Sequence, residues 1–410
     1  MSSLLALVLD GRFLFTVFAC LVAIAWLARV VPALWMLPRV PNLLRASDAA
    51  SGSEMGALTD SIDWPSVTVI VPAKDEAAAI DKALSSLLAS DYPRLQIVAV
   101  DDRSTDDTGR LMDALAAAPE SQGRLRALHV QELPEGWMGK PHAMVLAATG
   151  VDSDWLLFTD ADVMFDPSTI RLAIQFATRS QGDHMVLYPT LVLRGAAEKM
   201  LIAFFQSVSA WAGRPWNIAN PKAHKDYIGV GAFNLIRRPV YEALGGYTEL
   251  RMEVLEDMRL GFRVKREGYA QRVAFGKDLV RIRWADSAWG ILNNLTKNLY
   301  STFRFRTSLL LVACVGIFVL CLTPFVALLV PGPARWAGVA TLTALLLLNV
   351  RYWRLTDISP AYLALFPIAA LMFVWTLLRS MILVLWRGGV LWRGTFYPLQ
   401  ELRRHAGPLW

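Results

Sequence analysis

Cysteine is scarce in this sequence, and the few cysteines show no functional spacing. The chain of 410 residues has three, Cys20, Cys314 and Cys321, and each lies within an apolar run. They form no CxxC pair and no Cys/His metal-binding spacing, which argues against a disulfide scaffold and a cysteine-based zinc site. We therefore interpret all three as small buried hydrophobic residues.

Charge is also low, which argues against an ordinary soluble protein. Charged residues make up 19% of the chain and hydrophobic residues 55%, and the mean hydropathy is +0.38. Soluble domains usually carry about 25% charged residues. The formal net charge of +6 includes no long basic run. No nucleic-acid partner is therefore expected, and the modest basicity fits anionic lipid headgroups instead.

An apolar segment from Phe13 to Leu37 is interrupted only by Arg29. It is long enough to span about 30 Å of hydrocarbon. Arg29, Arg39 and Arg45 flank its C-terminal side, which places the following segment in the cytoplasm by the positive-inside rule. The alternative is a cleaved signal peptide, but a basic n-region and a clear cleavage site are missing. We predict a retained transmembrane anchor over residues 1–45.

The last quarter of the chain also contains long apolar stretches. The second of them is short for a membrane span, and the third contains Arg379, which must reach the interface or mark a helix end. We predict two to three transmembrane helices over residues 307–388, followed by a basic tail, 389–410. Four spans would put the C-terminus outside, whereas the basic tail favours the cytoplasm, so the side of the C-terminus stays open. The apolar stretches are Ser308 to Val330, Ala337 to Val350 and Ala361 to Trp386.

The region between the apolar segments has the composition of an α/β domain. Residues 46–65 are predicted to form a linker, 66–288 the domain, and 289–306 an amphipathic helix at the membrane interface. Strand-like apolar runs alternate with helical spacing, which predicts a mostly parallel sheet with helices on both faces. The three runs are Val67 to Val71, Leu95 to Val100 and Trp155 to Phe158.

Each of the three runs ends in a polar cluster. Ligands of such sheets bind at the carboxyl ends of the strands, so these clusters are expected to meet at one edge. Two carboxylates spaced one residue apart at a strand end suit Mg²⁺ or Mn²⁺, which prefer oxygen ligands and often bridge protein to phosphate. A further carboxylate across the pocket can take a proton from an attacking hydroxyl. The clusters are Pro72 to Glu76, Asp101-Asp102 and Asp160-Ala161-Asp162, and Glu256-Asp257 follows later in the chain.

With these motifs in place, residues 67 to about 270 resemble membrane-bound family 2 glycosyltransferases with the GT-A fold. Gly136 to Lys140 is similar to a motif of the ceramide-glucosyltransferase-like and hopanoid-associated branches. The resemblance implies a metal-dependent transferase that uses a nucleotide-diphosphate sugar, UDP by default, and inverts the anomeric centre. It implies a GT-A domain flanked by transmembrane helices.

The resemblance also implies roles for single residues. Asp257 is the expected catalytic base, supported by Glu256. Asp162 is expected to bind the divalent metal, with Asp160 on the metal, the sugar or the diphosphate. The expected nucleotide-sugar contacts, from the nucleobase to the phosphates, come from Asp102, Asp101, Pro72, Ala73, Glu76 and Lys140.

Simpler explanations exist for several of these residues. Asp101 and Asp106 are also good helix N-caps, and Glu256-Asp257 suits the first turn of a helix. Asp160 to Asp162 could also form a solvated turn. Gly229 and Gly231 precede an apolar run, where glycine permits either a close backbone approach to a ligand or a tight turn.

One family feature is missing. Processive members and ceramide glucosyltransferases carry Gln/Arg-x-x-Arg-Trp about 35 residues after the acidic pair, where this chain has Asn293 to Asn298. We therefore predict transfer of a single sugar to a membrane lipid by a multi-pass inner-membrane protein with a cytoplasmic catalytic domain. The alternatives are a processive polysaccharide synthase and a non-catalytic membrane scaffold.

Overall fold

A computed structural model describes residues 11–44 and 63–407 of the chain. Its contacts divide the chain into two compact units. The sheet unit comprises Val40–Val192, Pro215–Trp284 and Gly389–Trp410, and the helical unit comprises Met1–Arg39, Leu193–Arg214 and Ala285–Gly388.

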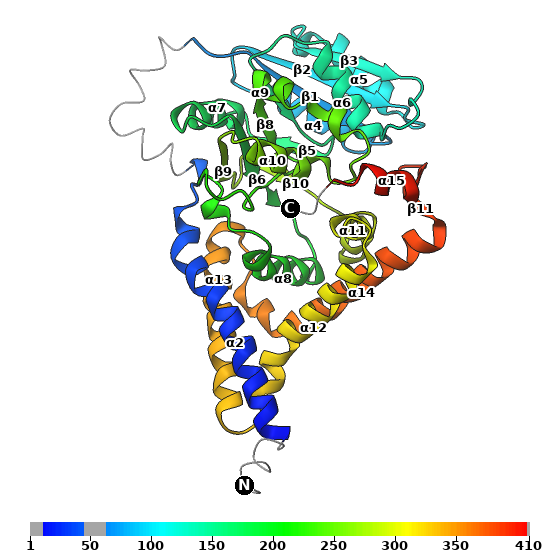
Figure 1. The fold of residues 1–410 in the computed structure, drawn as a ribbon. Helices are drawn as coiled ribbons and strands as arrows, with labels where there is room; N and C mark the ends of the chain where they lie inside the picture. Colours follow the sequence, from blue (N-terminus) through cyan, green and yellow to red (C-terminus); the bar gives the residue numbers. More distant parts are fainter. Residues whose placement is uncertain (1–10, 45–62, 408–410) are drawn as a thin grey trace, which may run out of the picture. The chain divides into compact units, whose positions relative to one another are not determined.

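The sheet unit is built on a seven-stranded, mostly parallel sheet, as predicted (Figure 1). Strand β8 is antiparallel to both of its neighbours, β4 and β6, and the other neighbouring pairs are parallel. In sheet order the strands are β3 (Leu125–Val130), β2 (Leu95–Asp102), β1 (Val67–Ala73), β4 (Trp155–Phe158), β8 (Asn234–Arg237), β6 (His184–Tyr188) and β9 (Gln271–Phe275).

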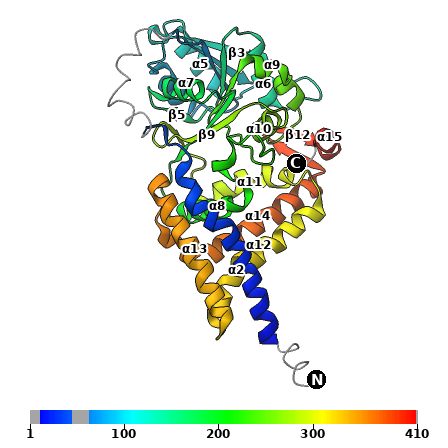
Figure 2. The same ribbon diagram turned by 60° about the vertical axis from the view of Figure 1, so that its left-hand side comes forward.

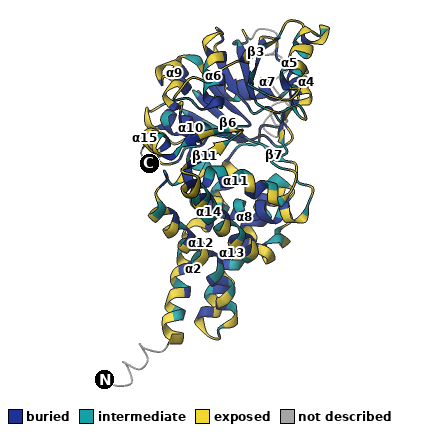
Figure 3. Cartoon of the chain, turned by 90° about the vertical axis from the view of Figure 1, so that its right-hand side faces the viewer, coloured by how far each residue is buried: buried dark blue, intermediate teal, exposed yellow. Residues whose placement is uncertain are grey.

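Helices cover both faces of this sheet, which explains why its central strands are apolar throughout. All seven residues of β1 are buried, and Figure 3 shows the strands of the sheet mostly in the colour of buried residues. Val69 packs into the cluster that includes α4, α5 and α7, and Ile70 packs into the cluster that includes α6, α9 and α10. A strand buried on both faces shows a continuous apolar run instead of an alternating one. The helices are α4 (Ile80–Leu88), α5 (Thr108–Ala117), α6 (Gly139–Thr149), α7 (Thr169–Arg179), α9 (Arg238–Ala243) and α10 (Glu256–Arg266).

Smaller elements complete the sheet unit. A three-stranded sheet contains β5 (Val163–Phe165), β10 (Val280–Ile282) and β7 (Thr190–Leu191). The C-terminal segment forms an antiparallel hairpin of β11 (Gly389–Trp392) and β12 (Thr395–Pro398), followed by α15 (Leu399–His405). The 3₁₀ turns are η2 (Pro119–Ser121), η3 (Pro215–Asn217) and η4 (Gly246–Leu250).

Within its described residues, the helical unit contains four helices long and apolar enough to cross a membrane. Helix α13 packs beside both α2 and α12, and α14 packs beside α11 and α12 (Figure 2). Large apolar side chains such as Leu21, Val312 and Trp386 are exposed on these helices, as expected for surfaces that face lipid. The helices are α2 (Gly11–Met36), α8 (Ala196–Ala212), α11 (Ala288–Thr302), α12 (Thr307–Leu329), α13 (Pro333–Thr356) and α14 (Phe366–Arg387), with the 3₁₀ turns η1 (Leu37–Arg39) and η5 (Pro360–Leu365).

The helical unit differs from the sequence interpretation at α13 and at Arg379. Helix α13 has 24 residues because it continues through the charged ends of a stretch that looked too short to span. Arg379 does not mark a helix end, because α14 continues to Arg387. Its guanidinium donates to Asn293 Oδ1 (2.9 Å) and Thr296 Oγ1 (2.7 Å) on α11, and packs on the ring of Trp289 at 5.5 Å.

The division into units also differs from the predicted domain limits. Residues 193–214, expected within the 66–288 domain, belong to the helical unit, and the expected basic tail belongs to the sheet unit. The predicted linker, residues 46–65, lies almost wholly outside the described residues, as do the first ten residues of the predicted anchor.

Candidate functional site

The ends of three parallel strands place most of the predicted site residues at one edge of the sheet. Strand β1 ends at Ala73, paired with Asp101 of β2, and Ile70 of β1 pairs with Phe158 of β4. Pro72 and Ala73 are therefore the last two buried residues of β1, and Glu76 follows in the next loop. Asp160 and Asp162 occupy the short connection between β4 and β5.

Lys140 links two of the acidic motifs directly. Its Nζ lies 2.6 Å from Asp160 Oδ1 and 2.6 Å from Glu256 Oε1. Lys140 is the second residue of α6, and Glu256 is the first residue of α10. The side chain of Glu256 is only 5% exposed, against 34% for Asp160. The ammonium group therefore neutralises the buried end of the site, while Asp160 keeps an open side.

Crowding and burial change the acidity of these groups. The pKa of Glu256 is raised to about 7, mainly by burial and to a smaller extent by neighbouring Asp257, while Lys140 opposes the rise. Burial also raises the pKa of Asp257, and Lys140 again opposes it. Burial disfavours the Lys140 ammonium, but Asp160, Glu256 and Asp257 outweigh that effect and raise the pKa of Lys140. Several strongly perturbed groups at one place are typical of functional sites.

The glycines before β8 permit the close approach of two of these carboxyl groups. The Gly231 carbonyl accepts a hydrogen bond from the Asp160 N–H (3.1 Å), and its own N–H donates to the Asp257 carboxylate. A Cβ atom at Gly231 would lie 2.5 Å from Asp160 Oδ2, and one at Gly229 would clash with the Asp257 carbonyl. These glycines therefore lie close to residues of the site, while the approach of their backbone to a ligand stays a prediction.

Asp162 is the second carboxyl of the Asp-x-Asp motif. Burial, followed by the charges of Asp160 and Glu76, raises its pKa to about 7. Among the described residues, no group of three or more His, Cys, Asp or Glu side chains is arranged to hold a metal. A cation that takes one or two carboxylates from protein and the rest of its ligands from phosphate and water still fits this oxygen-donor set.

Asp102 lies at the end of β2, against the first turn of α6. It is buried and forms an ion pair with Arg103, whose Nε lies 2.8 Å from Asp102 Oδ1. A Cβ atom at Gly139 would clash with the Asp102 carboxylate, so glycine is required where α6 begins. Asp102 and Lys140 therefore reach the site from adjoining segments.

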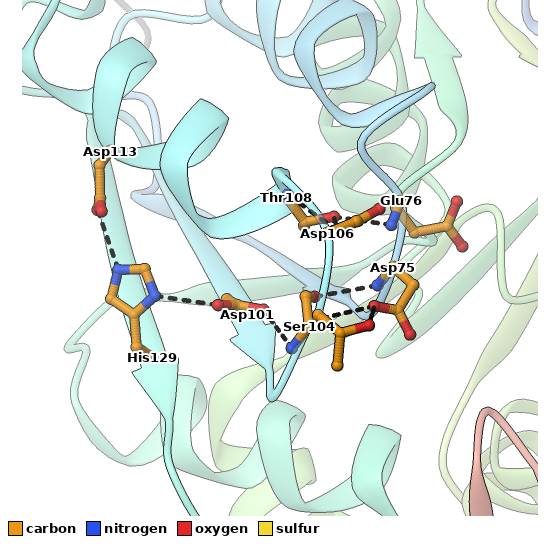
Figure 4. A network of polar contacts seen from close by, with 9 residues as sticks. Asp75, Glu76, Asp101, Ser104, Asp106, Thr108, Asp113 and His129 are labelled. Carbon is orange, nitrogen blue, oxygen red and sulfur yellow. Dashed lines mark hydrogen bonds and ion pairs between the residues drawn. The ribbon is translucent and has the colours of Figure 1, made fainter.

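Asp101 is not brought to this group. Its Oδ1 accepts from the Ser104 N–H (3.0 Å), and its Oδ2 lies 3.2 Å from His129 Nδ1 (Figure 4). Asp113 holds the other nitrogen of His129, at 3.0 Å. Successive side chains of a strand point to opposite faces, so Asp101 and Asp102 diverge. Asp101 fixes the loop after β2 and the packing of α5.

The loop that carries Glu76 is held by polar contacts rather than by regular structure. Thr108 Oγ1 accepts from the Glu76 N–H at 2.8 Å (Figure 4). Asp106 Oδ2 accepts from the Ala77 N–H at 3.1 Å. Asp106 Oδ1 also accepts from the Thr108 N–H at 3.0 Å, but the N-cap residue of α5 is Asp107, so Asp106 lies one position before the cap that the alternative assigned to it. The structure thus ties Asp106 to loop and helix geometry.

Sequence reasoning missed three residues that lie against the predicted site. Arg103 pairs with Asp102, Arg393 contacts Glu76, and Tyr397 accepts a hydrogen bond from the Gly139 N–H (3.2 Å). The last two belong to the hairpin of β11 and β12, which was predicted as a basic tail. The available signal was Gly394 between two short apolar runs, since glycine is common at the second position of two-residue hairpin loops.

Comparison with known proteins gives a family match over the sheet unit. Residues 68–245 match the model described as "Glycosyl transferase family 2". The 4,4'-diaponeurosporenoate glycosyltransferase of Staphylococcus aureus (strain bovine RF122 / ET3-1) is 23% identical over 55% of this chain and 60% of its own. The enzyme of the same name from Staphylococcus haemolyticus (strain JCSC1435) is 25% identical over 48% of this chain and 50% of its own. The chain thus spans about half to three fifths of the length of these curated relatives.

A solved structure shares the fold over most of the chain. The mannosyltransferase of Pyrobaculum calidifontis, in complex with GDP-Man and Mn²⁺, covers 91% of this chain and 99% of its own, with a TM-score of 0.50 and 18% identity. At this identity the likeness is one of fold alone, and it confirms the GT-A architecture that the family resemblance implies.

Proposed function

Because this chain belongs to glycosyltransferase family 2, we propose that it transfers one sugar from a nucleotide-diphosphate sugar to a membrane lipid, with inversion and with a divalent metal. The observation that carries the proposal is the meeting of the acidic motifs around Lys140. Lys140 contacts both Asp160 and Glu256, and its charge also acts on Asp257. A scaffold without activity would have no need to keep these buried charges together.

In the proposed reaction Asp257 acts on the acceptor. Its carboxylate takes the proton of the attacking hydroxyl as the new bond to the anomeric carbon forms, and the nucleoside diphosphate leaves from the opposite face. Burial raises the pKa of Asp257, which makes it a stronger base than an exposed aspartate. Glu256 and Gly231 hold it in place, Glu256 through Lys140 and Gly231 through its N–H.

The donor is proposed to occupy the strand ends. Asp102 recognises the nucleobase, while Pro72, Ala73 and Glu76 line the nucleotide, and Asp101 only supports the loop beside them. Asp162, with Asp160, would hold Mg²⁺ or Mn²⁺, which when bound neutralises charge on the leaving diphosphate. UDP is the default nucleotide.

The acceptor and the location follow from the helical unit and the relatives. The matched relatives are named for 4,4'-diaponeurosporenoate, a carotenoid acid, which supports a lipid-like acceptor. The candidate membrane helices support a multi-pass inner-membrane protein, and the arginines after the first span support a cytoplasmic catalytic domain. The missing Arg-Trp motif favours single transfer over processive synthesis.

A donor and acceptor screen tests the proposal. Purified full-length protein in lipid vesicles is incubated with radiolabelled UDP- or GDP-sugars, Mn²⁺ and lipid extracts that contain carotenoids. We expect an organic-soluble product with one added sugar, which disappears with EDTA and in Asp162→Asn but persists in the surface variant Asp152→Asn. Long water-soluble products would support the processive alternative. Asp162→Asn equal to wild type, with no metal requirement, would remove the proposed metal role.

Metal affinity is expected to depend on pH. A carboxyl must be deprotonated to bind a metal, and the pKa of Asp162 is raised to about 7 by burial and by Asp160 and Glu76. Apparent Mn²⁺ affinity should therefore fall by about tenfold per pH unit below about pH 7 and level off above it. Mn²⁺ binding to the nucleotide-free protein, followed by electron paramagnetic resonance between pH 5.5 and 8.5, measures this. A flat profile, or the same profile in Asp162→Asn, would contradict it.

A further inference from the structure

The C-terminal hairpin turns at an arginine that its backbone position does not favour. Trp392 pairs with Thr395, so Arg393 and Gly394 alone form the loop between β11 and β12. Their φ angles are 47° and 76°, both in the left-handed region, as a type I′ turn requires. Asn, Asp or Gly usually occupies the first of these positions, since other L-residues are strained there. An arginine held in such a conformation is a reason to look for a function of its side chain.

The Arg393 side chain reaches the loop that follows β1. Its guanidinium donates to the Lys74 carbonyl and to the Glu76 carboxylate. It also lies close enough to Asp162 to favour the ionised form of that carboxyl. The hairpin therefore brings a cation beside Glu76 and Asp162, which are both expected to face the donor.

The other end of the hairpin is fixed at the start of α6. The buried Tyr397 hydroxyl accepts from the Gly139 N–H at 3.2 Å, one residue before Lys140. Leu399 and Leu402 of α15 are also buried, which anchors the segment that follows. The hairpin thus contacts two segments of the site, the loop after β1 and the first turn of α6, and it holds Arg393 between fixed strands.

Of the three cations Lys140, Arg103 and Arg393, Arg393 can exchange its carboxylate partner for a ligand most easily. Lys140 is held by the almost fully buried Glu256, and Arg103 by the buried Asp102. The pair of Arg393 and Glu76 is more open, with side chains 42% and 21% exposed. Ion pairs this exposed contribute little to stability. A phosphate carries more charge and offers a guanidinium two parallel hydrogen bonds, so it competes well with one carboxylate oxygen.

We propose that Arg393 is a donor-binding residue, which leaves Glu76 and binds the diphosphate of the nucleotide-sugar when the donor enters. The proposal rests on the function proposed above and adds to it a contact from the C-terminal hairpin. Lys140 then keeps its place between Asp160 and Glu256, and Arg393 carries the direct contact to phosphate.

The substitution Arg393→Asn removes the guanidinium while keeping the turn, so it tests the role of the side chain separately from the folding of the hairpin. Asparagine suits the left-handed position better than arginine, so Arg393→Asn should fold with an unchanged or higher melting temperature. Full-length wild type, Arg393→Asn, Arg393→Lys and the exposed control Arg404→Asn are titrated with UDP and GDP in saturating Mn²⁺. The nucleosides uridine and guanosine, which lack phosphate, are the matched probes.

We expect Arg393→Asn to bind the preferred diphosphate about tenfold or more weakly, as for loss of a charge-assisted bidentate contact, and to bind its nucleoside unchanged. Arg393→Lys should recover part of the loss, and Arg404→Asn should match wild type. In transfer assays the KM for the donor should rise more than kcat falls.

Equal diphosphate affinity in Arg393→Asn and wild type would overturn the proposal. Equal loss for nucleoside and diphosphate would also overturn it, because the role would then be structural. Failure of wild type to bind any nucleotide would instead count against the proposed function.

Discussion

Replacing Asp257 with asparagine is expected to lower kcat/KM for sugar transfer by about 10²–10⁴-fold, the usual contribution of a positioned general base. Asparagine has the same shape, and its carbonyl oxygen can still accept from the Met258 N–H, which bonds Asp257 Oδ1 at 2.7 Å. It cannot take a proton at neutral pH. The loss should therefore fall on the chemical step, with donor binding unchanged. Initial rates over a range of donor concentrations, with nucleotide titrations of the same samples, separate the two.

Two further variants make this result interpretable. Asp107→Asn removes an exposed carboxylate outside the site and should leave the rate unchanged. Glu256→Gln removes the charge that is paired with Lys140 and should lower the rate less than Asp257→Asn, because Glu256 only supports the base. If the rate of Asp257→Asn stays within about threefold of wild type and Glu256→Gln loses more, Glu256 is the base and Asp257 supports it.

The strands that carry the site can be predicted from the sequence because their signals are local. The apolar runs from Val67, Leu95 and Trp155 correspond to β1, β2 and β4, and the parallel arrangement follows from their alternation with helices. Each run ends where a polar cluster begins. The edge at which the acidic motifs meet therefore follows from the general rule for parallel sheets, without knowledge of the side-chain contacts.

The contacts inside the site cannot be predicted from the sequence because they join distant parts of the chain. Arg393 and Glu76 are 317 residues apart, and nothing near either residue marks the other as its partner. Lys140 is expected to meet the nucleotide, and nothing in the sequence indicates that it also pairs with Asp160 and Glu256. The divergence of Asp101 from Asp102 is different, since the two-residue period of a strand already implies it. That part of the site was within reach of the sequence.

Replacing Lys140 with methionine is expected to destabilise the sheet unit by about 3 kcal/mol at pH 8. That is the lower end of the cost of removing one partner from a buried ion pair, chosen because Asp160 keeps contact with solvent. Methionine fills much of the same volume but leaves Glu256, Asp257 and Asp160 without their shared cation. Thermal unfolding of full-length protein, followed by tryptophan fluorescence, measures the loss.

The loss of stability in Lys140→Met should become smaller as the pH falls. The direction of this change follows from the pKa of Glu256. Its pKa is raised to about 7 by burial even with Lys140 opposing the rise, so removal of Lys140 raises it further. A carboxyl whose pKa is higher in the folded protein than in the unfolded chain favours folding when protonated, so stability falls as pH rises between the two values. The stability of Lys140→Met should therefore be close to that of wild type at pH 6 and clearly lower at pH 8.

Two companion variants separate charge balance from simple loss of packing. Lys140→Arg keeps the cation and should lose less stability than Lys140→Met at pH 8. The double variant Lys140→Met with Glu256→Gln removes both partners and should recover most of the stability, because residues in direct contact do not contribute additively. An equal loss at pH 6 and pH 8, unrelieved in the double variant, would contradict the charge-balance account. It would mean that Lys140 supports the start of α6 by packing, and that Glu256 tolerates burial by some contact other than its ion pair.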